Sequence, residues 1–206
     1  MYARIATFEN PNLSLVDDLI GKVRSSAASG VDLPDAKGFL MLLDRQSAKS
    51  LGITFFDSEE AIRAAEPVFE RMGDEIPAEQ RGQRVSIEVY EVAAEELSEG
   101  AKAARVSVLE GSPERIEEGT RYAQENVLPK ARELQGWKGY ISLVDRDNGL
   151  FKLITLWDSE DSLTASEEQA NQLRKQAAEG SGETIVGVER YEVAVAERLS
   201  LGAETP

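Results

Sequence analysis

The chain contains two copies of one sequence unit, and the copies keep a constant spacing. Gly38 recurs as Gly139, an offset of 101 residues (139 − 38). Further segments share this offset: Ala3–Ile5 with Ala104–Val106, Asp44–Arg45 with Asp145–Arg146, Thr54–Glu59 with Thr155–Glu160, and Glu88–Ala93 with Glu189–Ala194. A register kept through so many positions indicates a tandem duplication. Each copy must therefore fold in the same way as the other.

The duplication divides the 206 residues into two units of ordinary domain size. We expect a first repeat at 1–94, a linker at 95–102, a second repeat at 103–196 and a loose tail at 197–206. The predicted linker is charged and contains Gly100, as is typical of a connection between domains.

Each repeat shows the same succession of patterns, read as strand, helix, strand, strand, helix, strand. In the first repeat, residues 38–43 (GFLMLL) and 51–56 (LGITFF) are short apolar runs around a polar turn, which predicts a buried hairpin. Ser58 and Ser159 precede acidic residues and helical apolar spacing, and so predict helix N-caps. Pro129 predicts an irregularity inside a helix of the second repeat.

Composition excludes several classes of function. A net charge of −15 argues against a nucleic-acid groove or an anionic membrane surface as partner. The chain has no cysteine and no histidine, which excludes Ser-His-Asp and Cys-His catalysis and the usual metal and His-ligated haem sites. We expect no metal and no bound cofactor. No apolar run is long enough to cross a membrane, and we expect a cytoplasmic protein.

The element order predicts an α+β fold. Two crossovers that flank a hairpin give a four-stranded antiparallel sheet with both helices on one face, the ferredoxin-like βαββαβ arrangement. The strands are apolar on both sides in places, for example at 40–43 and 154–157. We therefore expect the two repeats to pack sheet to sheet as a barrel within one chain, a pseudo-dimer. Whether the chain pairs further into a homo-oligomer stays open.

One run of the second repeat resembles a known family. Residues 128–161 (LPKARELQGWKGYISLVDRDNGLFKLITLWDSED) combine Pro-x-x-Arg-x-x-x-Gly, a strand, a turn, and a strand that ends in Trp-x-Ser-x-Asp. This pattern is similar to the antibiotic biosynthesis monooxygenase-like domains of the dimeric α+β barrel superfamily. The first repeat keeps it loosely, with Asp35 where a glycine is usual and Phe56 in place of Trp157.

The resemblance implies a choice of activities. Members of the family include cofactor-free oxygenases of polyphenolic intermediates, haem-degrading monooxygenases and domains without known activity. The haem-degrading branch relies on a histidine that this chain lacks. The cofactor-free branch holds an ionised phenol in a pocket between sheet and helices while it meets oxygen, and that chemistry needs only polar and aromatic side chains.

Residues present in the second repeat and absent from the first are the candidate site residues. A duplicated scaffold can keep one working pocket, and we expect it between sheet and helices of the second repeat. The catalytic candidates are Tyr122, Asn126, Trp157 and Asn171. Tyr122 and Asn126 are four residues apart and share a helical face, while Trp157 also suits a core position.

Charged residues shared by both repeats allow two readings. Arg4 and Arg105 occupy equivalent strand positions, as do Glu88 and Glu189. They predict either a structural charge pair between neighbouring strands or a paired anion site.

Three hypotheses of function follow. The first is a cofactor-independent oxygenase that acts on a small aromatic or polyketide-like molecule. The second is a non-catalytic or stress-related barrel that binds a small hydrophobic or aromatic ligand. The third is a structural or assembly role.

Overall fold

The computed structural model describes residues 1–29, 33 and 35–197 of the chain. The first repeat contains β1 (Tyr2–Glu9), α1 (Val16–Ser29), β2 (Gly38–Asp44), β3 (Lys49–Phe56), α2 (Glu59–Glu75), α3 (Ala78–Arg81) and β4 (Gln83–Leu97). The second contains β5 (Ala103–Glu110), η1 (Pro113–Arg115), α4 (Ile116–Tyr122), η2 (Ala123–Val127), α5 (Leu128–Ala131), β6 (Trp137–Asp145), β7 (Leu150–Trp157), α6 (Glu160–Ala165), α7 (Glu167–Ser181) and β8 (Thr184–Glu197).

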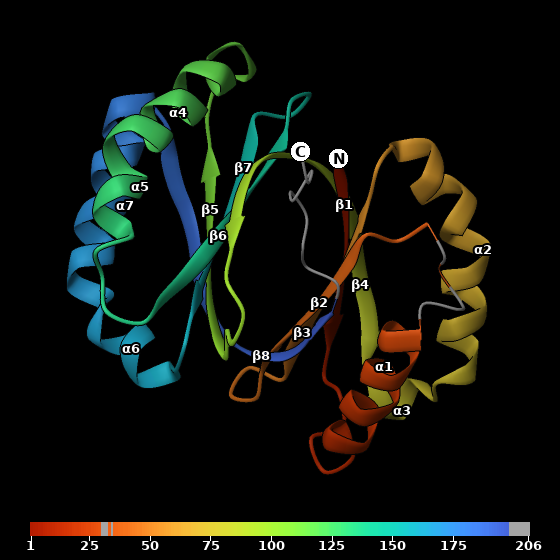
Figure 1. The fold of residues 1–206 in the computed structure, drawn as a ribbon. Helices are drawn as coiled ribbons and strands as arrows, with labels where there is room; N and C mark the ends of the chain where they lie inside the picture. Colours follow the sequence, from red (N-terminus) through yellow and green to blue (C-terminus); the bar gives the residue numbers. More distant parts are fainter. Residues whose placement is uncertain (30–32, 34, 198–206) are drawn as a thin grey trace, which may run out of the picture. The chain divides into compact units, whose positions relative to one another are not determined.

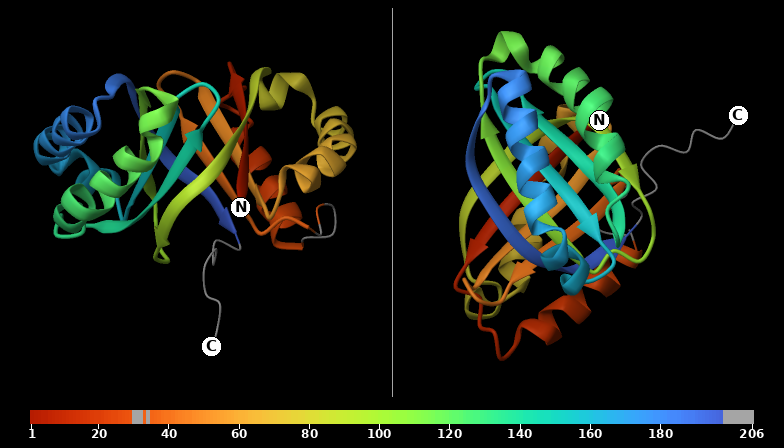
Figure 2. Two further views of the ribbon diagram at one scale, coloured as in Figure 1. Left: turned by 90° about the horizontal axis from the view of Figure 1, so that it is seen from above. Right: turned by 90° about the vertical axis from the view of Figure 1, so that its left-hand side faces the viewer.

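The strand order confirms the predicted fold class. By hydrogen bonding the strands follow the order β1-β3-β2-β8-β5-β7-β6-β4 and close into a barrel. The pairings β1–β3, β2–β3, β5–β7 and β6–β7 are antiparallel and repeat the same plan in each half. In each half the helices lie on one face of these strands: α1 and α2 in the first, α4 to α7 in the second (Figures 1 and 2).

The chain forms two compact units, each of which includes strand ends from both repeats. One unit comprises Met1–Tyr90 and the chain from Val193 onward, and the other is Glu91–Glu192. Strands β4 and β8 therefore contribute to both units. The predicted linker at 95–102 begins inside β4, which ends at Leu97. The repeat boundaries 1–94 and 103–196 stay a prediction, and residues 198–206 of the predicted tail lie outside the described residues.

Local chemistry explains where the helices begin and bend. The hydroxyl oxygens of Ser58 and Ser159 accept the backbone N–H groups of Ala61 and Ser162, at 3.2 Å and 3.1 Å. These N-caps confirm the sequence prediction. Immediately before Pro129 the helix widens into the π-helical turn η2, because proline lacks an N–H and its ring crowds the preceding turn. Within the described residues no helix has the length and hydropathy needed to cross a membrane.

One part of the core of each unit lies between its helices and its strands, and alternate strand residues such as Leu40, Leu42 and Ile53 are buried on the other face. In the first unit, Val16 and Ile20 of α1 pack on Met41 and Leu43 of β2. In the second, a cluster built in the same way joins Ile116 and Ala178 to Leu109, Val144 and Phe151. Alternate residues of each strand therefore face the helices.

Replacement of Gly139 by alanine tests the close pairing of β4 and β6. Gly139 has φ of +125°, and an added Cβ would lie 1.9 Å from the backbone oxygen of Glu96. We expect Gly139→Ala to lower the free energy of unfolding by about 3 kcal/mol, since strain and a backbone clash add together. Gly21→Ala is the control, because Gly21 lies in α1 with nothing within 4 Å of an added Cβ.

Urea denaturation measures both variants. Gly21→Ala should be neutral or raise stability by up to about 1 kcal/mol, because alanine favours the helix. Equal stabilities of the two variants would show that the β4–β6 pairing does not require a glycine.

Candidate functional site

A cavity of about 370 Å³ lies in the first unit between the helices and the strands. Its floor comes from side chains that share one face of the sheet, where Gly52 of β3 is the register partner of Ala6 in β1 and of Met41 in β2. Leu19 and Val23 of α1 also line it. The lining is mostly apolar, as in small-molecule sites.

Arg4, which lines this cavity, forms an ion pair in which the arginine is buried and the glutamate is partly exposed. Arg4 is 3% exposed, and its Nε and Nη2 donate to the two carboxylate oxygens of Glu66 in α2 at 2.7 Å and 3.0 Å. The guanidinium carbon of Arg4 lies 4.0 Å from the centre of the Phe69 ring. Both Arg4 and Phe69 line the cavity. The wall thus combines an aromatic ring with a cation whose charge a carboxylate balances.

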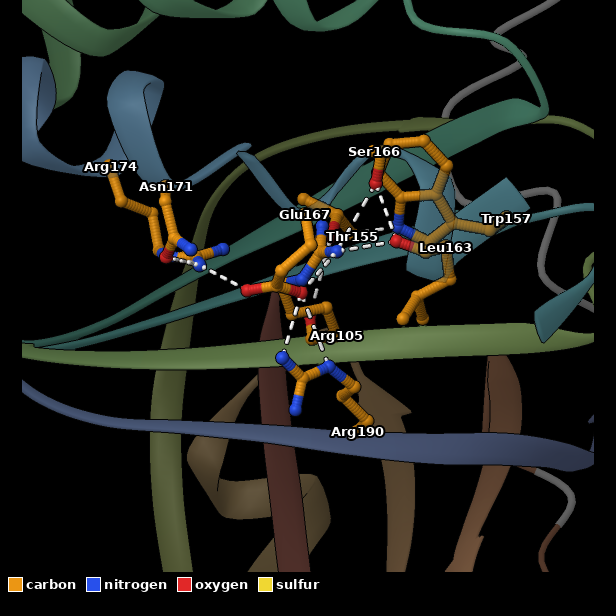
Figure 3. Close-up of polar contacts among 9 residues, drawn as sticks. All are labelled: Arg105, Thr155, Trp157, Leu163, Ser166, Glu167, Asn171, Arg174 and Arg190. Atoms are coloured by element: carbon orange, nitrogen blue, oxygen red, sulfur yellow. Dashed lines mark hydrogen bonds and ion pairs between the residues drawn. The ribbon is translucent and has the colours of Figure 1, made fainter. Parts of the chain in front are cut away.

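The second unit repeats the ion pair and then extends it. Arg105 and Glu167 stand 101 residues after Arg4 and Glu66, and Arg105 Nη2 donates to Glu167 Oε2 at 2.9 Å. The same nitrogen donates to the Leu163 carbonyl at 2.7 Å and to the Ser166 hydroxyl at 3.1 Å, at the break between α6 and α7 (Figure 3). This Arg–Glu pair therefore belongs to the shared scaffold.

Two more arginines contact the same carboxylate. Arg174 of α7 donates to Glu167 Oε1 at 3.0 Å, and Arg190 of β8 approaches Oε2 at 2.8 Å (Figure 3). Burial alone would raise the pKa of Glu167, but hydrogen bonds and charges from Arg190 and Arg105 together lower that pKa to about 2. The Glu167 carboxylate is therefore ionised at neutral pH.

In the second repeat, the predicted pairing of Arg105 with Glu189 is wrong in register. Arg105 is the direct cross-strand partner of Arg190, whereas Glu189 is opposite Val106. Since successive residues of a strand point to opposite faces, Glu189 lies on the other face of the sheet from Arg105. Its carboxylate accepts a hydrogen bond from the Tyr191 hydroxyl at 2.7 Å.

The structure separates the four candidate residues into two places. Trp157 is 1% exposed, packs with Ala103 and Leu163, and donates from Nε1 to the Thr155 hydroxyl at 3.2 Å. Asn171 is exposed, and its side-chain oxygen accepts from Arg174 Nη2 (Figure 3). These two candidates border the arginine cluster.

The other two candidates lie at the end of α4 and in the π-helical turn. The half-buried Tyr122 ring covers Gly180 of α7, where an added Cβ would lie 2.2 Å from the ring. Asn126 is exposed and donates from Nδ2 to the Tyr122 carbonyl at 3.1 Å. The Asn126 amide therefore bonds within its own helix, and among the described residues neither Tyr122 nor Asn126 is hydrogen-bonded to the arginine cluster.

The mostly apolar cavity lies in the first unit, although the sequence indicated the second. Residue size across the repeat accounts for this. Gly52, Gly73 and Ala36 line the first-unit cavity. Leu153, Arg174 and Trp137 stand 101 residues later. Larger side chains thus occupy the corresponding space in the second unit, a signal that could be read from the repeat alignment by comparing side-chain volumes.

Comparisons with known proteins agree with this fold. No family model matches the chain. Two uncharacterised proteins of Mycobacterium tuberculosis are similar in sequence. One is 27% identical over 203 residues, covering 95% of this chain and 88% of that protein, and the other is 24% identical over 205 residues, covering 95% and 84%.

Solved structures with the same fold are more distant in sequence. An anthrone oxidase-like protein superimposes with a TM-score of 0.68 at 15% identity and covers 100% of this chain and 96% of its own. A monooxygenase-like protein of Listeria innocua gives 0.53 at 14% identity with 93% of each chain covered, and a haem-degrading enzyme of Listeria monocytogenes gives 0.55 at 12% identity with 94% and 99% covered.

The chain is thus an α+β barrel protein. Within that class its fold is that of the antibiotic biosynthesis monooxygenase-like domains, as the sequence resemblance predicted.

Removal of the carboxylate from each ion pair tests whether its contribution to stability depends on the number of arginines that contact it. We expect Glu167→Gln to lower the free energy of unfolding by about 4 kcal/mol, because three guanidiniums lose their counter-charge. The matched change Glu66→Gln leaves one arginine unpaired and should cost about 2 kcal/mol. Chemical denaturation at neutral pH measures both.

Acid titration supplies the control. The pKa of Glu167 is lowered from 4.5, so its stabilisation is complete above pH 4.5 and is lost as the pH falls towards about 2. The difference between wild type and Glu167→Gln should shrink over that range. A difference that is constant with pH would contradict the ion-pair account.

Proposed function

We propose that the first-unit cavity binds a small, largely apolar ring compound. The observation that carries the proposal is a cavity of about 370 Å³ whose lining is mostly apolar and includes the polar side chains of Arg4 and Thr54. That volume lies within the range of small-molecule sites. Phe39 and Phe69 offer faces for a flat ring, and Met41 and Met72 offer adaptable apolar contacts.

The polar groups favour a ligand with a hydroxyl or carbonyl oxygen. Thr54 is the register partner of Arg4 and of Phe39, and all three line the cavity. Glu66 already balances the charge of Arg4, so the part of the cavity beside Arg4 suits a neutral polar group of the ligand rather than a second full charge. Phenols, naphthols and anthrone-like ketones have this combination.

Oxygenation without a bound cofactor is the second candidate function. It is supported by the fold, which this chain shares with an anthrone oxidase-like protein and with monooxygenase-like proteins. In such a reaction a ring methylene is converted to a carbonyl by O₂: one oxygen atom leaves as water with the two methylene hydrogens, and the other stays on carbon. No reductant is needed. The Thr54 hydroxyl, which lines the cavity, would donate a hydrogen bond to the substrate oxygen.

Haem does not fit this site. The residues that line the cavity include no histidine, cysteine or tyrosine to serve as the proximal ligand. We therefore derive no step through haem, although one structural neighbour is a haem-degrading enzyme. A cytoplasmic location, and the absence of nucleic-acid or membrane partners, remain part of this proposal.

A single substitution that fills the cavity tests the binding proposal. Gly52→Leu introduces the side chain that Leu153 has in the second repeat, and it projects from the cavity floor. We expect wild-type protein to bind 1-naphthol or anthrone in a calorimetric titration, and Gly52→Leu to lose at least tenfold in affinity because the space is occupied. Gly21→Leu is the control, since this position lies outside the cavity lining. Equal affinity of wild type, Gly52→Leu and Gly21→Leu for the ligand would show that it does not bind in the first-unit cavity.

Oxygen uptake separates catalysis from binding. Wild-type protein with anthrone in air is expected to consume one O₂ per anthraquinone formed, and Gly52→Leu is expected to fall to the rate of the buffer. Uptake that persists in Gly52→Leu would contradict catalysis in this cavity. Binding of anthrone without oxygen uptake would support the ligand-binding proposal and contradict the oxygenase proposal.

A further inference from the structure

Glu167 is surrounded by more positive charge than it can balance. Its side chain contacts Arg105, Arg174 and Arg190 at 2.9 Å, 3.0 Å and 2.8 Å (Figure 3). The side chains of Arg105 and Arg174 are only 2% and 8% exposed, whereas that of Arg190 is 52% exposed. Three guanidiniums and one carboxylate leave two positive charges at one place, in a chain whose net charge is −15.

The first unit shows that the scaffold does not need this excess. Its equivalent pair, Arg4 and Glu66, is balanced one to one. The positions equivalent to Arg174 and Arg190 hold Gly73 and Val89. The two additional arginines are therefore specific to the second unit, and they come from different elements, α7 and β8, that converge on one carboxylate.

Nothing else in the described chain is seen to balance these arginines. Among the described residues, Arg174 and Arg190 bond to Glu167 and Asn171, and Asn171 carries no charge. Arg105 Nε is buried and has no hydrogen-bond partner. Arg105 and Arg174 are buried and share the single carboxylate of Glu167, and buried positive charge in excess of its counter-charge is costly.

We propose that the second unit binds a dianionic oxyanion, a phosphate group, at Arg174 and Arg190. Arg174 contacts Glu167 and Asn171 through Nη2, and its Nε and Nη1 make no hydrogen bond to the residues that the structure describes. Arg190 uses Nε and Nη2 on Glu167, and its exposure leaves Nη1 accessible from solvent. Planar guanidiniums bind phosphate oxygens through paired N–H donors. Two charges on the anion match the excess of two on the protein.

NMR of the arginine Nε–Hε groups tests the site in the full chain. Inorganic phosphate and phenyl phosphate are titrated at constant ionic strength against sodium chloride, with thermal unfolding in parallel. We expect saturable shifts of the Arg174 and Arg190 signals and a rise of a few degrees in Tm with phosphate. Tighter binding of phenyl phosphate would identify a phosphate ester as the ligand, and equal binding would identify free phosphate.

The variant replaces an arginine of the second unit with the residue at the equivalent position of the first repeat. Arg190→Val should weaken phosphate binding at least tenfold, whereas Arg63→Val, at an exposed arginine of the first unit paired with Glu59 and Glu60, should leave it unchanged. A phosphate response no larger than that of chloride in wild-type protein would overturn the proposal, whether or not the variants fold. Unchanged phosphate binding by folded Arg190→Val would overturn it as well.

Discussion

In each unit, a buried arginine of the first strand is bonded to a glutamate of the second helical segment. Arg4 pairs with Glu66 and Arg105 with Glu167, in the same place of the repeat. Both arginines are almost fully buried, so each needs its carboxylate in order to fold into the interior. The helix is thereby held over one position of the sheet, and the space between helix and sheet depends on the residues around this pair.

The same pair has opposite surroundings in the two units. Small residues such as Gly52 and Gly73 leave room beside Arg4, and a cavity results. Beside Arg105, the equivalent positions hold Leu153 and Arg174, which fill the space and bring more positive charge to Glu167. A duplicated scaffold can diverge in this way because the ion pair conserves the helix position while neighbouring side chains change size. Our two proposals, an apolar ligand in one unit and an oxyanion in the other, follow from this divergence.

The sequence predicted the fold because the fold depends on periodic and local signals. The constant offset, the apolar hairpin strands and the serine N-caps at Ser58 and Ser159 are all readable without tertiary information, and Pro129 marked the widened helical turn. Strand register was harder: the sequence paired arginines with Glu88 and Glu189, but a shift of one residue places Glu189 on the opposite face.

The site was less predictable because cavities depend on side chains from several elements at once. Aromatic and amide residues such as Trp157 and Asn126 drew attention to the second repeat, yet Trp157 is core and Asn126 bonds to its own helix. The informative residues were glycines and an alanine, which leave space for a cavity because they have no side chain or a small one. Comparison of these small residues with the bulky residues 101 positions later indicates which unit contains the cavity.

The central claim is that the space between helices and strands is open in the first unit and filled in the second. The three methionines of the chain allow the most direct measurement. Met41 and Met72 line the first-unit cavity, and Met1 does not. In protein labelled with ¹³C at the methionine methyl groups, titration with 1-naphthol should shift the Met41 and Met72 signals saturably and leave Met1 unchanged. Signals of Met41 and Met72 that do not move at any ligand concentration would contradict the account.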